Sequence, residues 1–208
     1  VHVLPDKTVV VHHDATLGRC GNAEGSIYRL RRDTVKSFSV GEKFSLKFKS
    51  ETIPLFEEVL VYLKENGLFL NCEIKNQSGF IYPYEDEVIK LINHYGMAQN
   101  AIISSFDHRI LKNIKSKYEN YKVAILYGET FGINVIDYCK QNNFDAINPY
   151  YGIVDENLVK AAHENNIAVN VWTVDNIEDI QRMCNYGVDS NITNDVEAGI
   201  KGARAANN

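Results

Sequence analysis

The sequence predicts an α/β fold of the TIM-type (β/α) barrel class. From residue 69 onward, short runs rich in β-branched and aromatic residues alternate with longer amphipathic runs. Strands and helices that alternate over short connections are typical of βαβ units on a parallel sheet. Six such units in a row favour a closed barrel, and an open parallel sheet is the alternative.

Each of these runs defines an expected element. The predicted strands cover residues 69–75, 101–106, 122–127, 145–150, 167–174 and 188–193. The predicted helices cover residues 84–95, 108–117, 133–141, 156–165 and 177–186.

The first third of the chain has a different pattern. Two β-like runs, residues 1–4 and 8–13, are joined by Pro5-Asp6-Lys7. A polar, glycine-containing stretch follows at about 18–50 and is too long for an ordinary connection, so we expect a small excursion from the barrel. A helix is expected from Ile53-Pro54 to about residue 65.

Composition excludes several classes of protein. The 208 residues suit one domain, and we expect a single barrel domain over residues 1–208. The net charge of −5 and the scattered Lys and Arg residues make nucleic acid an improbable partner. No apolar run reaches the roughly 18 residues of a spanning helix, and the chain starts without a signal-peptide pattern. The expected location is therefore the cytoplasm.

The run 69–75 places charged residues on one face of a strand. Side chains alternate with period two, so Cys72 and Ile74 share one face, while Asn71, Glu73 and Lys75 share the other. Buried ions cost several kcal/mol each unless they are compensated. That cost falls at the C-terminal mouth of a barrel, where active sites of this architecture lie. A buried Glu–Lys pair or an exposed edge strand is the structural alternative.

Two further places carry candidate chemistry. The β-branched run 9–11 ends in His12, His13 and Asp14, and histidine exchanges protons near neutral pH. Trp172, the only tryptophan, falls near the end of a predicted strand, where it could wall a substrate site or fill the core. Two surface histidines and a core tryptophan are the plainer interpretations.

Six motifs, in order, resemble the glycerophosphodiester phosphodiesterase family. They are VHVLPDKTVVVHHDATLGR at 1–19, IPLFEEVL at 53–60, NCEIK at 71–75, ISSFD at 103–107, VWTV at 171–174 and GVDSNIT at 187–193. The resemblance implies hydrolysis of glycerophosphodiesters to an alcohol and glycerol 3-phosphate, as part of lipid and glycerol metabolism.

The resemblance also implies roles for five residues. Glu73 would be a ligand of a divalent cation, Mg²⁺ or Ca²⁺, and Lys75 would neutralise the phosphate diester. His13 would act with a second histidine in general acid–base catalysis. Phe106 and Trp172 would contact the substrate.

The family pattern is only partly present. Its first strand with "HRG", its first helix and its "ExD" metal carboxylates have no match in this chain, and Asn194 interrupts its final "TD". Residues 1–208 alone are therefore expected to be inactive and to bind divalent metal poorly, and the enzyme is expected to be the full-length parent protein, with the missing motifs upstream of Val1. A barrel without its first strand has open edges, which would allow pairing with a second copy of the chain.

Two other functions fit the same residues. A barrel without the missing groups could be a non-catalytic binding or interaction domain. A related phospholipase acting on lysolipids or sphingolipids is the other alternative, and it would call for an exposed apolar rim. The alcohol moiety of the substrate has no signature in the sequence.

Overall fold

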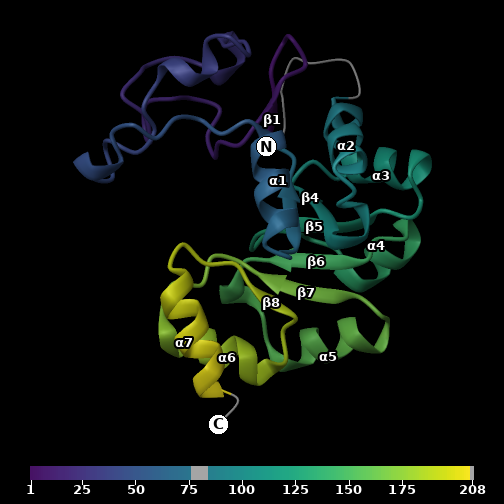
Figure 1. Ribbon diagram of the computed structural model, residues 1–208. Coiled ribbons are helices and arrows are strands. Elements are labelled where there is room, and N and C mark those ends of the chain that lie inside the picture. Colours follow the sequence, from purple (N-terminus) through teal and green to yellow (C-terminus); the bar gives the residue numbers. More distant parts are fainter. Residues whose placement is uncertain (76–83, 207–208) are drawn as a thin grey trace. The chain divides into compact units, whose positions relative to one another are not determined.

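A computed structural model describes residues 1–75 and 84–206 of the chain. The chain forms two compact units, Val1–Ala101 and Ile102–Asn208. Figure 1 shows the helices and strands of both. Within the described ranges, no helix has the length and apolarity needed to cross a membrane.

The second unit is built on a parallel sheet. Its strands are β4 (Ala101–Ser105, whose first residue ends the first unit), β5 (Lys122–Tyr127), β6 (Ala146–Pro149), β7 (Ala168–Val171) and β8 (Ser190–Asn191). Each strand pairs in parallel with the next one along the chain. A doubly wound sheet reverses its strand order at a switch point, whereas a (β/α) barrel keeps sequence order. The topology is therefore that of a barrel wall.

Helices alternate with these strands along the chain. They are α3 (His108–Lys117), α4 (Val135–Asn142), α5 (Glu156–Glu164), α6 (Ile177–Tyr186) and α7 (Val196–Ala206). Helix α3 contacts β5, α4 contacts β6, and α5 contacts β7. Asn or Asp side chains cap α3 to α6 by accepting a backbone N–H of the first turn, and the residues are Asp107, Asn134, Asp155 and Asn176.

The predicted alternation is confirmed, with shorter strands than expected at 145–150, 167–174 and 188–193. Helix α7 was not predicted, and it contains Gly199 and Gly202. Glycine lowers helix propensity, so the local pattern was weak. Gly202 is buried against Ile180 of α6, and a Cβ at this position would lie 2.6 Å from Ile180 Cγ2. Close packing of the two helices accounts for the glycine.

The first unit begins with a small antiparallel hairpin. Strands β1 (His2–Val3) and β2 (Val9–Val10) pair His2 with Val10 and Val3 with Val9. The turn is closed by hydrogen bonds between Leu4 and Thr8 and between Lys7 and Leu4. The two predicted β-like runs are thus confirmed as two shorter strands.

The excursion expected at about 18–50 is present. It contains the 3₁₀ turns η1 (Ile27–Arg29), η2 (Val35–Ser37) and η3 (Leu46–Phe48) and no long helix or strand. It is held by an apolar cluster of its own that also includes hairpin residues: Leu4, Val10, Leu17, Ile27, Leu30, Val35, Ile53 and Leu55. The excursion is therefore packed structure rather than an open linker.

The remaining elements of the first unit are α1 (Phe56–Glu65), β3 (Leu70–Glu73), α2 (Glu85–His94) and the turn η4 (Ala98–Asn100). The period-two pattern predicted for the β3 region is confirmed. Leu70, Cys72 and Ile74 are buried, whereas Glu73 and Lys75 are partly exposed. One face of the strand thus packs into the core, and the side chains of the other face are accessible to a ligand.

Candidate active site

Two segments distant in sequence bring the predicted charged residues of the first unit together. His13 and Asp14 follow β2 along the chain. Glu73 is the last residue of β3, and Lys75 lies just after it. The backbone N–H of Lys75 donates to the carbonyl of Val1 at 3.1 Å. That bond ties the end of β3 to the start of the hairpin, and it explains how residues 62 positions apart meet.

Lys75 contacts both of the other predicted groups. Its Nζ lies 2.7 Å from Glu73 Oε2 and 3.4 Å from His13 Nε2. An ammonium group has only donors, so Nε2 of His13 accepts this contact and its proton lies on Nδ1. Nδ1 then donates to Asp14 Oδ1 at 2.7 Å. The network therefore fixes the tautomer of His13 and leaves its Nε2 lone pair directed at the charged side of the site.

Asp14 is held as a carboxylate. Arg19 binds it through two hydrogen bonds, Nε to Oδ2 at 2.5 Å and Nη2 to Oδ1 at 2.9 Å. The Arg19 guanidinium, with the contact from His13, holds the pKa of Asp14 well below its usual range. Asp14 therefore stays ionised at neutral pH. Through its contact with Nδ1, this carboxylate holds the His13 ring in one orientation.

A cavity of about 470 Å³ adjoins these groups within the first unit. His12, His13, Glu73 and Lys75 line it on one side. The rest of its lining is mainly apolar and includes Val11, Phe56, Val59, Leu70 and Cys72. A pocket with mostly apolar walls and a few convergent polar groups is typical of a small-molecule site.

The two adjacent histidines differ in environment. His12 is buried and its Nδ1 lies 2.8 Å from the carbonyl oxygen of Asp14, whereas the His13 side chain is 69% exposed. Within the described residues, Nε2 of His12 meets no hydrogen-bond partner. His12 thus supports the turn that presents His13, and His13 is the more exposed of the two imidazoles.

Few of the described side chains could bind a divalent cation at this site. Among residues 1–75 and 84–206, no three His, Cys, Asp or Glu side chains converge as a metal site would require. Glu73 offers one partly exposed carboxylate, which Lys75 contacts. Mg²⁺ keeps several waters and binds through one or two carboxylates together with phosphate oxygens. The described residues therefore fit such an ion as a single ligand and do not form a complete site.

The two predicted substrate contacts lie together in the second unit. Phe106 follows β4 and is 52% exposed, and Trp172 follows β7. Their ring centroids are 5.5 Å apart in an edge-to-face arrangement, and Tyr150 lies 5.8 Å from Trp172. Trp172 Nε1 donates to the carbonyl of Asn148 at 2.8 Å. The Trp172 side chain is therefore half-buried, with its indole N–H bonded to the backbone.

Sequence analysis missed two polar residues inside the second unit. Asn148 of β6 is fully buried, and Asn170 of β7 is nearly so. Asn170 Nδ2 donates to Asn148 Oδ1 at 2.9 Å, and in the described part of the chain Asn148 Nδ2 has no partner. The sequence signal for this pair was an asparagine inside each of two predicted strands. Asn170, for example, shares a strand face with Trp172. Barrel strands otherwise place branched apolar residues inside.

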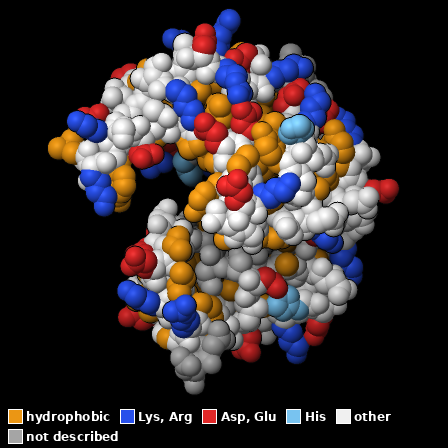
Figure 2. Space-filling model, in the orientation of Figure 1, with side chains coloured by type: hydrophobic (Ala, Val, Ile, Leu, Met, Phe, Trp, Pro, Cys, Tyr) orange, Lys and Arg blue, Asp and Glu red, His pale blue; other side chains and the backbone are white. Residues whose placement is uncertain are grey.

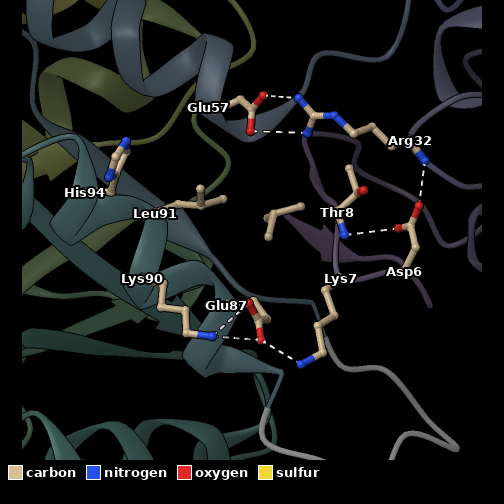
Figure 3. A pocket seen from close by; sticks show the side chains of 10 residues that line it. Asp6, Lys7, Thr8, Arg32, Glu57, Glu87, Lys90, Leu91 and His94 are labelled. Carbon is tan, nitrogen blue, oxygen red and sulfur yellow. Dashed lines mark hydrogen bonds and ion pairs between the residues drawn. The ribbon is translucent and has the colours of Figure 1, made fainter.

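A larger cavity of the first unit, about 660 Å³, holds none of the predicted residues. Its basic and glutamate side chains pair with one another, and the Asp6 carboxylate accepts from the backbone N–H groups of Thr8 and Arg32 (Figure 3). Arg32 binds Glu57, and Glu87 lies 3.3 Å from both Lys7 and Lys90. The cavity lined by His13 and Lys75 is therefore the better candidate, because its groups match the expected chemistry.

His2 connects this site to the excursion and has a consequence for stability. It is buried, with Nδ1 2.8 Å from the hydroxyl of Tyr28 and Nε2 3.4 Å from the carbonyl of His13. Burial lowers the pKa of His2 from 6.5 to about 4. The folded protein therefore keeps His2 neutral while the unfolded chain takes up a proton, so its contribution is full above pH 6.5 and is lost as pH falls toward 4.

We expect the free energy of unfolding to fall over that interval, with a share of at most about 3 kcal/mol from His2. The His2→Gln variant should show a smaller fall, measured by urea unfolding of the full-length protein between neutral and acidic pH. His94→Gln, at an exposed histidine of the same unit, is the control. An equal fall in wild type and His2→Gln would contradict the prediction.

Comparison with known proteins bears on this site. The glycerophosphoryl diester phosphodiesterase family matches residues 1–198. A glycerophosphodiester phosphodiesterase of Caldanaerobacter subterraneus is 33% identical over 95% of this chain and 81% of its own length. One of Bacillus altitudinis is 28% identical over 97% of this chain and 83% of its own length.

Solved structures show the same fold. A phosphodiesterase of Oleispira antarctica, in complex with the product sn-glycerol-3-phosphate, superposes with a TM-score of 0.87 at 17% identity, over 99% of this chain and 81% of its own. A glycerophosphodiester phosphodiesterase of Parabacteroides distasonis superposes with a TM-score of 0.81 at 21% identity, over 100% of this chain and 82% of its own. The predicted barrel class is thereby confirmed. The chain belongs to the glycerophosphoryl diester phosphodiesterase family.

Proposed function

We propose that the protein hydrolyses glycerophosphodiesters to an alcohol and glycerol 3-phosphate at the cavity lined by His13, Glu73 and Lys75. The observation that carries the proposal is the contact chain from Glu73 through Lys75 and His13 to Asp14. It unites a fixed positive charge and a group able to carry a proton. Phosphoryl transfer needs both, because negative charge spreads over phosphate oxygens and an alcohol must leave.

His13 would supply the proton for the departing alcohol. Once protonated on both ring nitrogens, it keeps its bond to Asp14 through Nδ1 and presents Nε2–H to the substrate. A water oxygen attacks phosphorus and gives up its proton to the second histidine that the family resemblance implies. The bond between phosphorus and the alcohol oxygen breaks as the new bond forms, and the proton on Nε2 of His13 passes to the departing oxygen. The carboxylate of Asp14 stabilises the imidazolium before the transfer.

Lys75 would neutralise the phosphate. Its ammonium already lies 3.4 Å from His13 Nε2, so a phosphate oxygen bound by Lys75 would stand beside the proton donor. Glu73 would orient Lys75 and offer one carboxylate oxygen to a divalent cation, Mg²⁺ or Ca²⁺. Such an ion would add positive charge beside the phosphate.

Phe106 and Trp172 would contact the substrate. Their edge-to-face pair offers an apolar surface with the Trp172 indole N–H already bound to Asn148. An aromatic pair of this kind could pack against the carbon skeleton of the substrate or attract a cationic headgroup such as choline.

The test is hydrolysis of glycerophosphocholine and glycerophosphoglycerol by the full-length protein, with glycerol 3-phosphate measured as product. We expect the protein to hydrolyse at least one of these two substrates. EDTA should abolish the hydrolysis, and Mg²⁺ or Ca²⁺ should restore it. Turnover that EDTA leaves unchanged would contradict the cation. Absence of glycerol 3-phosphate in all conditions would contradict the function and favour the binding-domain alternative.

Other expectations stay predictions. They are the single barrel domain over residues 1–208, the cytoplasmic location, the absence of nucleic acid among the partners and the pairing of two copies through an open edge.

A further inference from the structure

We propose that the end of the excursion around η3, residues 41–51, docks on an anionic lipid surface. This segment, called the tip below, carries two of the most exposed large apolar side chains described in the chain. Phe44 is 86% exposed and Leu46 is 73% exposed. Neither belongs to the apolar cluster that holds the excursion together.

The tip is preformed. Val40 N–H donates to the Glu51 carbonyl at its base, and Phe44 and Ser45 both donate to the carbonyl of Gly41. The Ser45 hydroxyl also accepts from Lys47 N–H at the start of η3. Such a hydrogen-bonded loop presents Phe44 and Leu46 at little further cost in conformational entropy.

Gly41 shows how closely the two sides of the tip approach. A Cβ at this position would lie 2.4 Å from the carbonyl oxygen of Phe48 and 2.7 Å from its Cβ. The ring of Phe48 packs at 5.8 Å from that of Phe44. The aromatic pair thus lies on a tight turn, which leaves Phe44 directed outward.

Lysines flank the apolar side chains. Lys43, Lys47 and Lys49 are exposed; Lys43 Nζ binds the carbonyl of Gly18, whereas Lys47 Nζ lies 4.8 Å from the centroid of the Phe48 ring. The exposed acid of the tip, Glu51, lies at its base. Figure 2 shows hydrophobic and basic side chains side by side in this part of the excursion. Glu42, the acid nearest in sequence, is turned back to bind Asn22 at 3.3 Å.

The exposed apolar side chains and the lysines of the tip together indicate which kind of partner it binds. Exposed Phe and Leu side chains ringed by lysines are typical of segments that insert shallowly among lipid headgroups, where the lysines meet phosphates. Among the described residues, no strand runs through the tip, so it offers no strand edge to a peptide. An anionic lipid surface therefore fits it better than a protein groove.

The experiment is vesicle flotation with the full-length protein. Vesicles of phosphatidylcholine mixed with phosphatidylglycerol are compared with phosphatidylcholine alone, at low and high salt. We expect binding to the anionic vesicles only, weakened by salt. Replacing Lys47→Gln and Lys49→Gln together should weaken binding by roughly 20- to 30-fold, given the usual contribution of a basic residue near such a surface.

The apolar contribution has its own variant. Phe44→Ser with Leu46→Ser should weaken binding by at least about tenfold, because the buried apolar area is lost. Control variants are Val196→Ser, at an exposed apolar residue of α7, and Lys160→Gln, at an exposed lysine of α5. Both should bind like wild type. Glycerophosphodiester turnover in solution should not change in the tip variants, so this result is independent of the proposed reaction.

Three outcomes would overturn the proposal. The first is no binding to anionic vesicles, and the second is equal binding to vesicles without phosphatidylglycerol. The third is a concentration-dependent dimer in sedimentation that the Phe44→Ser, Leu46→Ser variant abolishes, because the tip would then cover a second copy of this chain.

Discussion

Replacing His13 by alanine is expected to lower kcat for glycerophosphocholine by about 10²- to 10⁴-fold, the usual contribution of a general acid or base. The physical reason is that choline is a poor leaving group without a proton, and His13 is the accessible imidazole beside Lys75. The measurement is steady-state release of glycerol 3-phosphate by the full-length protein.

The assigned role makes a sharper demand on the same variant. In a substrate that carries a p-nitrophenyl group in place of choline, p-nitrophenolate can leave without taking up a proton. His13→Ala should therefore lose far less activity toward that substrate. His94→Ala, at an exposed histidine at the end of α2, should behave like wild type toward both substrates. Equal losses on the two substrates would refute proton donation, and near wild-type turnover of glycerophosphocholine would refute any catalytic role.

Lys75→Met is expected to lower kcat by about 10²- to 10³-fold, comparable to the loss of one fixed electrostatic donor at a reacting centre. Methionine keeps much of the length of the side chain but removes its charge, so phosphate oxygens would face Glu73 without compensation. Kinetic constants separate the effects: a lower kcat shows stabilisation of the transition state, whereas a raised KM alone shows ground-state binding only.

Two further variants test Lys75. Lys90→Met removes an exposed lysine that contacts Glu87 on α2 and should leave kcat unchanged. Lys75→Arg keeps the charge with a different geometry and should recover part of the activity. Full activity in Lys75→Met would contradict the role, provided that thermal unfolding shows the variant to be folded.

Much of the fold followed from local pattern. The alternation of β-rich and amphipathic runs predicted the strands and helices of the second unit, because parallel strands buried under helices need that periodicity. Helices α3 and α6 have the predicted bounds. Helix α7 was missed, because its glycines are unfavourable locally and are explained only by packing against Ile180.

The sequence by itself determined which side chains share a face. Period two placed Glu73 and Lys75 together and opposite Cys72 and Ile74, since successive side chains of a strand point to opposite sides. The motifs also determined the family and the order of the candidate residues.

Only the tertiary structure decided which of these residues meet. Sequence did not distinguish His12 from His13 by environment, and burial of His12 leaves His13 as the more exposed imidazole. The contact of Lys75 with His13 spans 62 positions. The exposure of Phe44 likewise depends on how the excursion packs. Long-range pairing and burial are properties of the whole chain in three dimensions, because they depend on which distant surfaces exclude water together.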